Sequence, residues 1–268
     1  MEVISGLSET TLRLSVFAGV FIIMAVAEAL MPRRERVLPK SRRWFTNLGL
    51  VVINSVFVRV TFPMVAIGAA AVAEARGWGL LAFTDWPVWI KTLVAVLVLD
   101  WAIYVQHVAT HKIPVLWRLH QVHHADRDID VTSGTRFHPI EIALSMIYKM
   151  AVVVALGASP LAVLIFEVVL NAMAMFSHAN FDLGATLDRW VRLVVVTPDM
   201  HRVHHSEIHE ETDSNYGFNL SIWDRIFRTY RPQPRRGHID MTIGLAPYQD
   251  EKPASLKWSL LLPFQRMK

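Results

Sequence analysis

The chain of 268 residues contains no cysteine, and only 19% of its residues are charged. The absence of cysteine excludes disulfide bonds, iron–sulfur clusters held by thiolates and zinc sites built from cysteine. The sequence also contains no H-E-x-x-H motif of zinc proteases, no G-x-G-x-x-G fingerprint and no Walker loop. Because no dinucleotide or ATP site is visible, any redox reaction of this chain must draw its electrons from another protein.

Long apolar runs take the place of the missing charges, and 53% of the residues are hydrophobic. Each of these runs carries at most two charged side chains: 11–31, 45–73, 93–106 and 142–166. A bilayer core requires about 20 helical residues, so the first two runs are long enough to span it. Pro63 predicts a kink in the second run, and the sequence from Gly157 to Pro160 predicts a turn inside a helical hairpin. The sequence therefore predicts an all-α, multi-pass integral membrane bundle of four to five spans.

A short basic segment lies between the first two runs. Its positively charged residues are Arg33, Arg34, Arg36, Lys40, Arg42 and Arg43. The positive-inside rule places this segment in the cytoplasm, where we expect it to contact anionic lipid headgroups rather than nucleic acid. Threading the chain from there brings the end of the third span, near residue 107, and the whole of 181–268 to the cytoplasmic side.

Three histidine-rich boxes follow the apolar runs. They contain His107 and His111, then His120, His123 and His124, and then His201, His204 and His205. Neutral imidazole is the commonest nitrogen ligand for Fe, Zn, Cu and Ni. Eight imidazoles exceed what one ion can use, so the count indicates two metals in one site.

The spacing within the boxes supports this interpretation. His107 and His111 leave the same face of a helix. In each H-x-x-H-H box, two histidines can converge on one ion, while the neighbouring residue turns about 100° away towards a second ion. Asp100 and Tyr104 precede the first box on the same stripe, and we expect Asp100 to accept the outer ring N–H of a ligating histidine.

Four histidines lie outside the boxes. His138 precedes the predicted hairpin and His178 closes it, so we expect both at the same membrane mouth as the boxes and include them among the ligands. His209 has acidic neighbours and His238 follows two arginines, so we expect both at the surface.

From about Asp100 to Tyr230 the chain resembles the fatty acid hydroxylase/sterol desaturase superfamily of membrane di-iron oxygenases. The resemblance depends on the three boxes in order and on their flanking sequences: Leu116-Trp117-Arg118, Arg136-Phe137-His138-Pro139-Ile140-Glu141, His178-Ala179-Asn180, Thr197-Pro198-Asp199-Met200, Asn215-Tyr216-Gly217 and 220–230. The family usually has glycine where this chain has Arg228. Residues 1–92 carry no comparable signature.

The resemblance implies an O2-dependent reaction on a C–H bond of a lipid, either hydroxylation or desaturation. It also implies two iron ions, O2 as co-substrate, a lipid substrate drawn from the bilayer, and an external electron donor, either a ferredoxin or a b-type cytochrome with its reductase. We expect a membrane anchor over 1–92, a catalytic domain over 93–232 whose cytoplasmic helical cap bears the boxes, and a cytoplasmic tail over 233–268. Asn215 is expected to help orient the ligands and is grouped with Asp100 and Tyr104 as a catalytic candidate. Trp101, Tyr104, Met175, Phe176 and Trp223 are candidate lining residues of a substrate pocket.

One alternative function stays open from the sequence. Imidazole also suits zinc, so the chain could be a membrane metal-binding or transport protein without redox catalysis. The ligands of a transporter should lie near the middle of the membrane on broken helices, whereas these boxes are predicted at one mouth. The substrate and the electron donor are not specified by the sequence.

Overall fold

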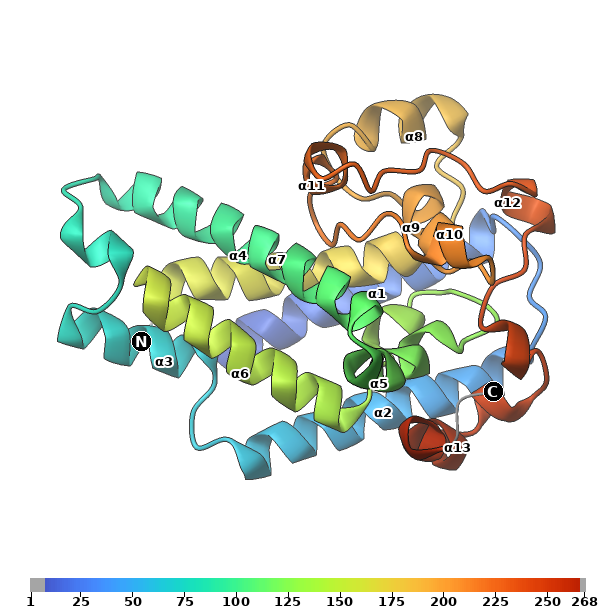
Figure 1. Cartoon of the computed structure of the whole chain (residues 1–268), viewed down its shortest axis with the longest axis horizontal. Coiled ribbons are helices and arrows are strands. Elements are labelled where there is room, and N and C mark those ends of the chain that lie inside the picture. The colour runs from blue at the N-terminus through green and yellow to red at the C-terminus, as the bar shows by residue number, and fades with distance from the viewer. Residues whose placement is uncertain (1–7, 266–268) are drawn as a thin grey trace.

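The computed structural model describes residues 8–265, which are helical throughout except for turns, loops and isolated bridges. Five segments are long and apolar enough to cross a membrane, as predicted: Glu9–Leu30, Lys40–Phe83, Val88–Lys112, Pro139–Leu156 and Pro160–His178. They correspond to α1 (Glu9–Leu30), α2 (Lys40–Thr61) with α3 (Ala66–Arg76) and η1 (Leu80–Phe83), α4 (Val88–Lys112), α6 (Pro139–Leu156) and α7 (Pro160–His178). These helices run along the long axis of the molecule (Figure 1).

Local sequence sets the ends of these helices. The second segment is broken into two helices: α2 stops at Thr61, and Phe62, which precedes Pro63, is extended with φ −108° and ψ 117°. This geometry is expected, because a proline ring disfavours the helical conformation of the preceding residue. Gly157 ends α6 in the left-handed region with φ 72°, and the hydroxyl of Ser159 then caps α7 by accepting from the backbone N–H of Ala162. The predicted kink and the predicted helical hairpin are therefore confirmed.

The spanning helices bury a shared core and turn other apolar side chains outward. Leu99 of α4, Val153 of α6 and Phe166 of α7 pack in this core and are fully or almost fully buried. In contrast, Val60 is 81% exposed and Phe45 is 72% exposed. Single exposed apolar residues are common on soluble proteins, but whole apolar helix faces indicate contact with lipid. The fold is that of a multi-pass membrane protein.

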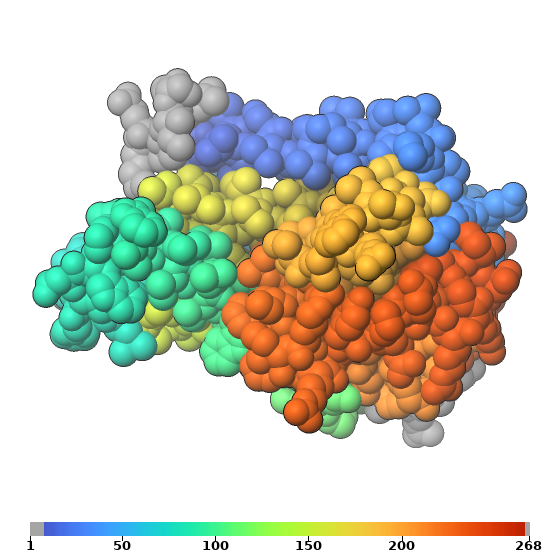
Figure 2. Space-filling view, turned by 90° about the horizontal axis from the view of Figure 1, so that it is seen from above, coloured from blue at the N-terminus to red at the C-terminus, as the bar shows by residue number. Residues whose placement is uncertain are grey.

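The remaining helices are short and form a cap at one end of the bundle. They are α5 (Pro114–His124), η2 (Ser133–Thr135), α8 (Ala185–Val191), α9 (Pro198–His204), α10 (His209–Thr212), α11 (Ile222–Ile226), α12 (Gly237–Asp240), η3 (Ala246–Tyr248), η4 (Lys252–Ala254), α13 (Leu256–Leu261) and η5 (Leu262–Phe264). Figures 1 and 2 show the cap at the end opposite to α3 and η1. All three histidine boxes lie at this end, as predicted.

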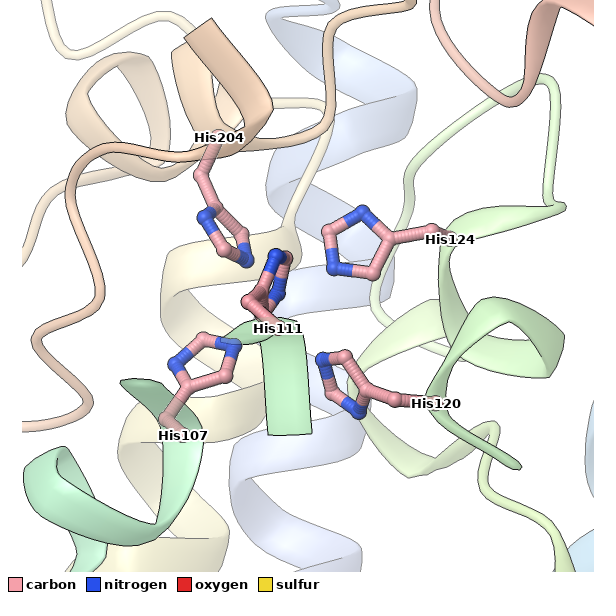
Figure 3. Close-up of side chains that lie close together, drawn as sticks. All are labelled: His107, His111, His120, His124 and His204. Carbon is pink, nitrogen blue, oxygen red and sulfur yellow. The ribbon is translucent and has the colours of Figure 1, made fainter. Parts of the chain in front are cut away.

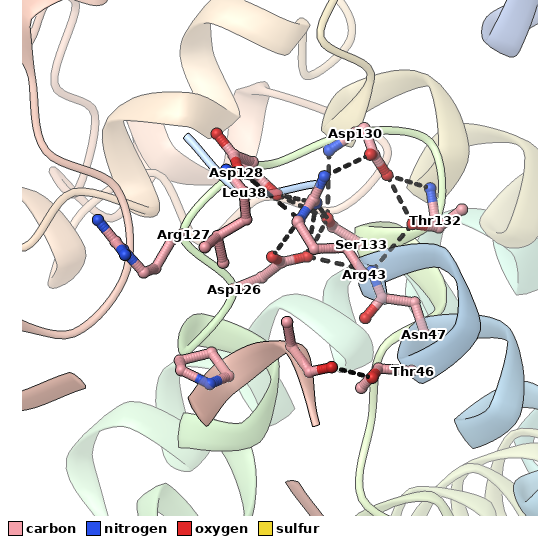
Figure 4. A network of polar contacts seen from close by, with 12 residues as sticks. Leu38, Arg43, Thr46, Asn47, Asp126, Arg127, Asp128, Asp130, Thr132 and Ser133 are labelled. Carbon is pink, nitrogen blue, oxygen red and sulfur yellow. Dashed lines mark hydrogen bonds and ion pairs between the residues drawn. The ribbon is translucent and has the colours of Figure 1, made fainter. Parts of the chain in front are cut away.

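Two residues of the basic segment after α1, Arg33 and Arg43, bind the cap, so the expectation that they contact lipid headgroups is wrong. Arg43 is fully buried, and its guanidinium donates to Asp126 at 2.7 and 2.8 Å and to Asp130 at 2.6 Å (Figure 4). Burial alone would raise the pKa of Asp126, but the guanidinium of Arg43 holds that pKa well below its usual range. Arg33 forms a further bidentate ion pair with Asp199, at 3.0 and 3.1 Å. These basic residues therefore attach the cap to the membrane helices.

Residues 233–265 form part of the cap. Arg136 is fully buried and connects three parts of the chain. Its guanidinium donates to Asn47 of α2 at 2.8 Å and, at 2.9 Å each, to the carbonyl of Pro253 and the hydroxyl of Ser259. Burial lowers the pKa of Arg136 to about 10, so the side chain stays charged at neutral pH. The division into anchor, catalytic domain and tail remains a prediction, but the described part of the tail belongs to the same packed unit.

Candidate metal centre

Four helices and one adjoining residue bring nine histidines together where the cap meets the ends of the spanning helices. α4 and α7 contribute residues from their last turns, and α5 and α9 contribute the two H-x-x-H-H boxes. Both box helices begin with a proline at the first helical position, where the missing N–H costs nothing, and the hydroxyl of Thr197 caps α9 by accepting from the N–H of Met200. The nine residues are His107, His111, His120, His123, His124, His178, His201, His204 and His205.

The rings form two groups, and within each group the candidate ligand atoms all lie within 4.8 Å of one another. The first cluster contains His107, His111, His120, His124 and His204. Figure 3 shows these five rings pointing towards one another from α4, α5 and α9. The second cluster contains His123, His178, His201 and His205.

Adjacent histidines of one box belong to different clusters. His123 and His124 separate in this way on α5, as do His204 and His205 at the end of α9. Successive residues of a helix point about 100° apart, so each box helix supplies ligands to two neighbouring positions. The geometry therefore offers two neighbouring groups of histidines, each of which could hold one metal ion.

Hydrogen bonds to the outer nitrogens fix how the rings point. Nδ1 of His107 donates to the carbonyl of Tyr216 at 2.7 Å, and Nδ1 of His204 donates to the carbonyl of Ser214 at 2.8 Å. Nδ1 of His120 donates to the carboxylate of Glu141 at 2.6 Å. A proton held on Nδ1 leaves the lone pair of Nε2 free, which is the usual preparation of a metal-ligating histidine.

The inward nitrogens of the first cluster have no hydrogen-bond partner. The buried Nε2 atoms without one include those of His107, His111, His120, His124 and His204. Buried polar atoms of native proteins are almost always paired, so five unpaired acceptors converging on one point fit a cation. The donor set consists of nitrogen only, which suits Fe, Zn, Cu or Ni rather than Mg or Ca.

The distances between ring nitrogens in the second cluster also fit a bound cation. Nε2 of His178 lies 3.1 Å from Nε2 of His123 and 3.0 Å from Nε2 of His201, and Nε2 of His205 lies 3.2 Å from Nε2 of His201. Two nitrogens bound at right angles to one ion at about 2.1 Å lie about 3.0 Å apart. Three such contacts in one group therefore match a shared ion better than a set of hydrogen bonds between neutral rings.

Electrostatics keep these rings neutral. Burial, followed by the proximity of other imidazoles, lowers the pKa of five histidines of the cap: His123, His124, His201, His204 and His205. The pKa of His204 falls to about 3. Metal binding requires neutral imidazole, so at neutral pH no proton has to be removed from these rings before a metal can bind.

One protein-family model matches the part of the chain that contains the histidine clusters. The family model described as fatty acid hydroxylase matches residues 92–229, which include every histidine of both clusters. The chain belongs to the fatty acid hydroxylase family.

Three kinds of curated relative of this family are similar to the chain. An ornithine lipid hydroxylase from Rhizobium tropici is 27% identical over 85% of this chain and 70% of its own length. Alkylglycerol monooxygenase from Homo sapiens is 29% identical over 59% of the chain and 34% of its own length. Cholesterol 25-hydroxylase from Homo sapiens is 28% identical over 52% of the chain and 50% of its own length. No solved structure matches the chain.

The backbone conformation of Arg228 explains the family's preference for glycine at this position, from which this chain departs. Arg228, where the family usually has glycine, adopts a left-handed conformation with φ 61°. Glycine adopts this conformation without steric cost, whereas an L side chain is strained there. The family preference therefore reflects the turn after α11 and not the metal centre.

His138 is placed outside both clusters, which corrects its prediction as a ligand. Its Nδ1 accepts from the backbone N–H of Ile140 at 3.2 Å, and its Nε2 donates to the carbonyl of Leu260 at 3.2 Å. Both ring nitrogens are therefore used, and the residue caps α6. His209 is exposed, as predicted, with 84% of its side chain accessible. His238 is buried against Asp199, which corrects the prediction that it lies at the surface.

The three predicted catalytic residues support the cap from outside the clusters. Asp100 accepts from the indole N–H of Trp223 at 2.8 Å and from no histidine, so its expected role is wrong. The hydroxyl of Tyr104 pairs with Thr229 at 3.0 Å. Asn215, with φ 51°, donates to the carbonyl of Met200 at 2.9 Å, and it follows Ser214, whose carbonyl accepts from His204.

Glu141 and a cavity were missed by sequence reasoning. The cavity, of about 360 Å³, reaches from His107 and His120 to residues deep in α6 and α7. Its apolar lining residues include Phe17, Val51, Ile103, Phe137, Ile142, Met146, Leu170 and Phe218, and do not include the five lining residues proposed from the sequence. The position of Glu141, three residues after His138 at the start of a predicted span, was the available signal. Cavities of 300–1,000 Å³ with convergent polar groups are typical ligand sites.

Proposed function

We propose that the chain is an integral membrane di-iron enzyme that uses O2 to hydroxylate a C–H bond of a lipid. The observation that carries this proposal is the contact between the first histidine cluster and the cavity. His107 and His120 belong to that cluster and also line the cavity. A lipid chain in the cavity would therefore lie beside the candidate metal position.

Different residues of the chain have different roles in the proposed reaction. The first and second clusters would each hold one iron ion, and the two ions would supply the activation of O2 with electrons from an external ferredoxin or b-type cytochrome. Glu141 orients His120 and fixes its proton on Nδ1. Apolar side chains such as Phe137 and Ile142 exclude water and hold an alkyl chain against the histidines.

Hydroxylation is favoured over desaturation by the relatives. The printed names of the relatives describe hydroxylases of an ornithine lipid and of cholesterol, and a monooxygenase of alkylglycerol. All three reactions insert oxygen into a lipid, and we infer the same class of reaction here. The chain spans about a third of the length of the alkylglycerol monooxygenases and half of the cholesterol hydroxylase.

The first experiment compares metal content and lipid products for matched histidine variants. His204→Ala removes a member of the first cluster, and His123→Ala removes one of the second. His138→Ala is the control, because this buried histidine lies in neither cluster. We expect about two irons per chain in the parent and in the control, less in both cluster variants, and oxygenated lipids only where iron is retained.

Two results would contradict the proposal. Full product formation by His204→Ala would exclude a role for the first cluster in catalysis. Stoichiometric zinc that iron does not displace, without any oxygenated lipid, would favour the metal-binding or transport function instead. The position of both clusters in the cap, away from broken helices in mid-membrane, opposes transport.

We further propose that the cap faces the cytoplasm. The basic segment 33–43 supports this orientation through the positive-inside rule, although several of its side chains are bonded to the cap. Since the chain has no cysteine, single cysteines can report its orientation. His209→Cys, in the cap, should be labelled by a membrane-impermeant maleimide only after lysis, and Leu80→Cys, at the opposite end, should be labelled in intact cells. The reverse pattern would overturn the orientation.

A further inference from the structure

Three charged side chains meet inside the spanning helices. Glu167 of α7 accepts from Arg13 of α1 at 2.8 Å and also from Lys149 of α6. The side chains of Lys149 and Glu167 are only 12% and 8% exposed. Ionisable groups within membrane spans are costly and usually serve a function, and neither the histidine clusters nor the cap uses this group.

The charged group forms the end of the cavity that is remote from the histidines. Lys149 and Glu167 line the same cavity as His107 and His120. Lys149 follows Glu141, the partner of His120, by eight positions on α6, which corresponds to about 12 Å along the helix. The cavity therefore places a charged end and a metal end at a fixed separation.

Lys149 has unused hydrogen-bond donors at this end of the cavity. The carboxylates of Glu167 and Glu9 match the charges of Lys149 and Arg13, because Glu9 also accepts from Arg13 at 2.8 Å. An ammonium group carries three N–H donors, and among the described residues Lys149 donates to Glu167 alone. Two donors of this largely buried lysine therefore remain for a ligand in the cavity.

A path to this end is also present. A smaller hollow of about 160 Å³ is lined by Arg13, Leu14, Phe17 and Asn171. Phe17 and Asn171 line the main cavity as well. The side chain of Arg13 is 26% exposed, so the charged end adjoins the outer surface of the helices near the start of α1.

We propose that Lys149 and Arg13 anchor the anionic group of the lipid substrate, a carboxylate or a phosphate, while its alkyl chain extends to the histidines. This proposal rests on the proposed function and specifies its substrate class. The separation between the anchor and the clusters then determines which carbon is presented for oxidation. A plain hydrocarbon would leave the remaining donors of Lys149 without an acceptor, and a neutral hydroxyl would form a weaker hydrogen bond with them than an anion does.

The test measures binding and needs no turnover. Purified protein in phosphatidylcholine nanodiscs is titrated with three probes of equal chain length: palmitate, hexadecyl phosphate and hexadecanol. Lys149→Met removes the anchor while leaving Glu167 paired with Arg13, and Lys149→Arg restores the charge. Lys91→Met on α4, which removes a lysine that does not line the cavity, is the control.

We expect at least one anionic probe to bind the parent about ten- to a hundredfold more tightly than hexadecanol, as expected for one charged hydrogen bond. Lys149→Met should lose this preference, and Lys149→Arg and Lys91→Met should keep it. Preference for palmitate over hexadecyl phosphate, or the reverse, identifies the anionic group. Equal binding of all probes to the parent, or an unchanged preference in Lys149→Met, would overturn the anchor.

Two further measurements keep the outcomes separate. If Lys149→Met does not fold, the joint replacement Lys149→Met with Glu167→Met removes the ion pair, a change that buried pairs often tolerate, and the same loss of preference is expected. A chain that binds anionic probes as predicted but yields no oxygenated lipid would contradict the proposed function and support the anchor. A chain that oxygenates lipids without anionic preference would contradict the anchor alone.

Discussion

The carboxylate of Glu141, in the first turn of α6, lies 2.6 Å from Nδ1 of His120 on α5. Both residues are buried, and Glu141 also lines the cavity. The pair therefore joins the first histidine cluster, the cap and the start of a spanning helix.

Glu141→Gln should weaken metal binding by about 10- to 100-fold, because loss of the carboxylate lowers the basicity of His120 and loosens its orientation. Competition against a chelator of known affinity measures the change. Glu74→Gln, an exposed site on α3 at the opposite end, serves as the control. Equal affinities of the two variants would show that Glu141 does not support the metal centre.

Arg43→Met should destabilise the protein by about 3–5 kcal/mol, because it leaves Asp126 and Asp130 buried without their cation. Arg42→Met is the matched control. The side chain of Arg42 is 60% exposed and pairs with Glu251 at the surface, where such ion pairs contribute about 0–1 kcal/mol to stability. Thermal unfolding in detergent gives both values. Similar losses for the two variants would mean that the buried network does not hold the cap.

Arg228→Gly should raise the free energy of unfolding by about 1 kcal/mol, because it relieves the left-handed strain at φ 61°. Arg228→Ala removes the same side chain but retains a Cβ atom, so it should give no such gain. The difference between the two variants isolates the backbone effect. A gain from alanine equal to that from glycine would assign the effect to the lost guanidinium.

Acidification should destabilise the protein partly through His238. Burial lowers the pKa of His238 to about 4 in the folded protein, against about 6.5 in the unfolded chain. Between these values the unfolded chain takes up a proton that the folded one does not, so stability present above pH 6.5 is lost as the pH falls towards 4.

His238→Gln should reduce this pH dependence, and His209→Gln, at an exposed position, should not. Denaturant unfolding at pH 7 and at pH 5 provides the comparison. An identical loss of stability in the parent and in His238→Gln would contradict the prediction.

The sequence predicted the bundle, the hairpin and the gathering of the boxes because those features follow from local patterns. The length of the apolar runs predicts membrane spans, and Gly157 and Pro160 predict a turn. The spacing of the histidines predicts which of them share a helix face. The role of Asp100 could not be obtained in this way, because its partner Trp223 is over a hundred residues away.

Long-range pairing also explains the other errors. His138 and the basic segment were assigned from their position beside the membrane, but their partners come from the C-terminal part and from the loop after α5. Lys149 and Glu167, in contrast, are 18 residues apart and adjoin because α6 folds back on α7. Spacing along the chain contains no information on the contacts of His138 and of the basic segment.

The contacts of Arg136 bear on the order in which synthesis, folding and metal binding occur. Its carbonyl accepts from His123 of the second cluster, while its guanidinium is held by Pro253 and Ser259. A nascent chain that has reached His205 contains every histidine of both clusters but lacks these two acceptors. Metal insertion is therefore expected after residues 253–259 have been synthesised and have folded back onto the cap, so a chain shortened before them should be synthesised and yet remain poor in metal.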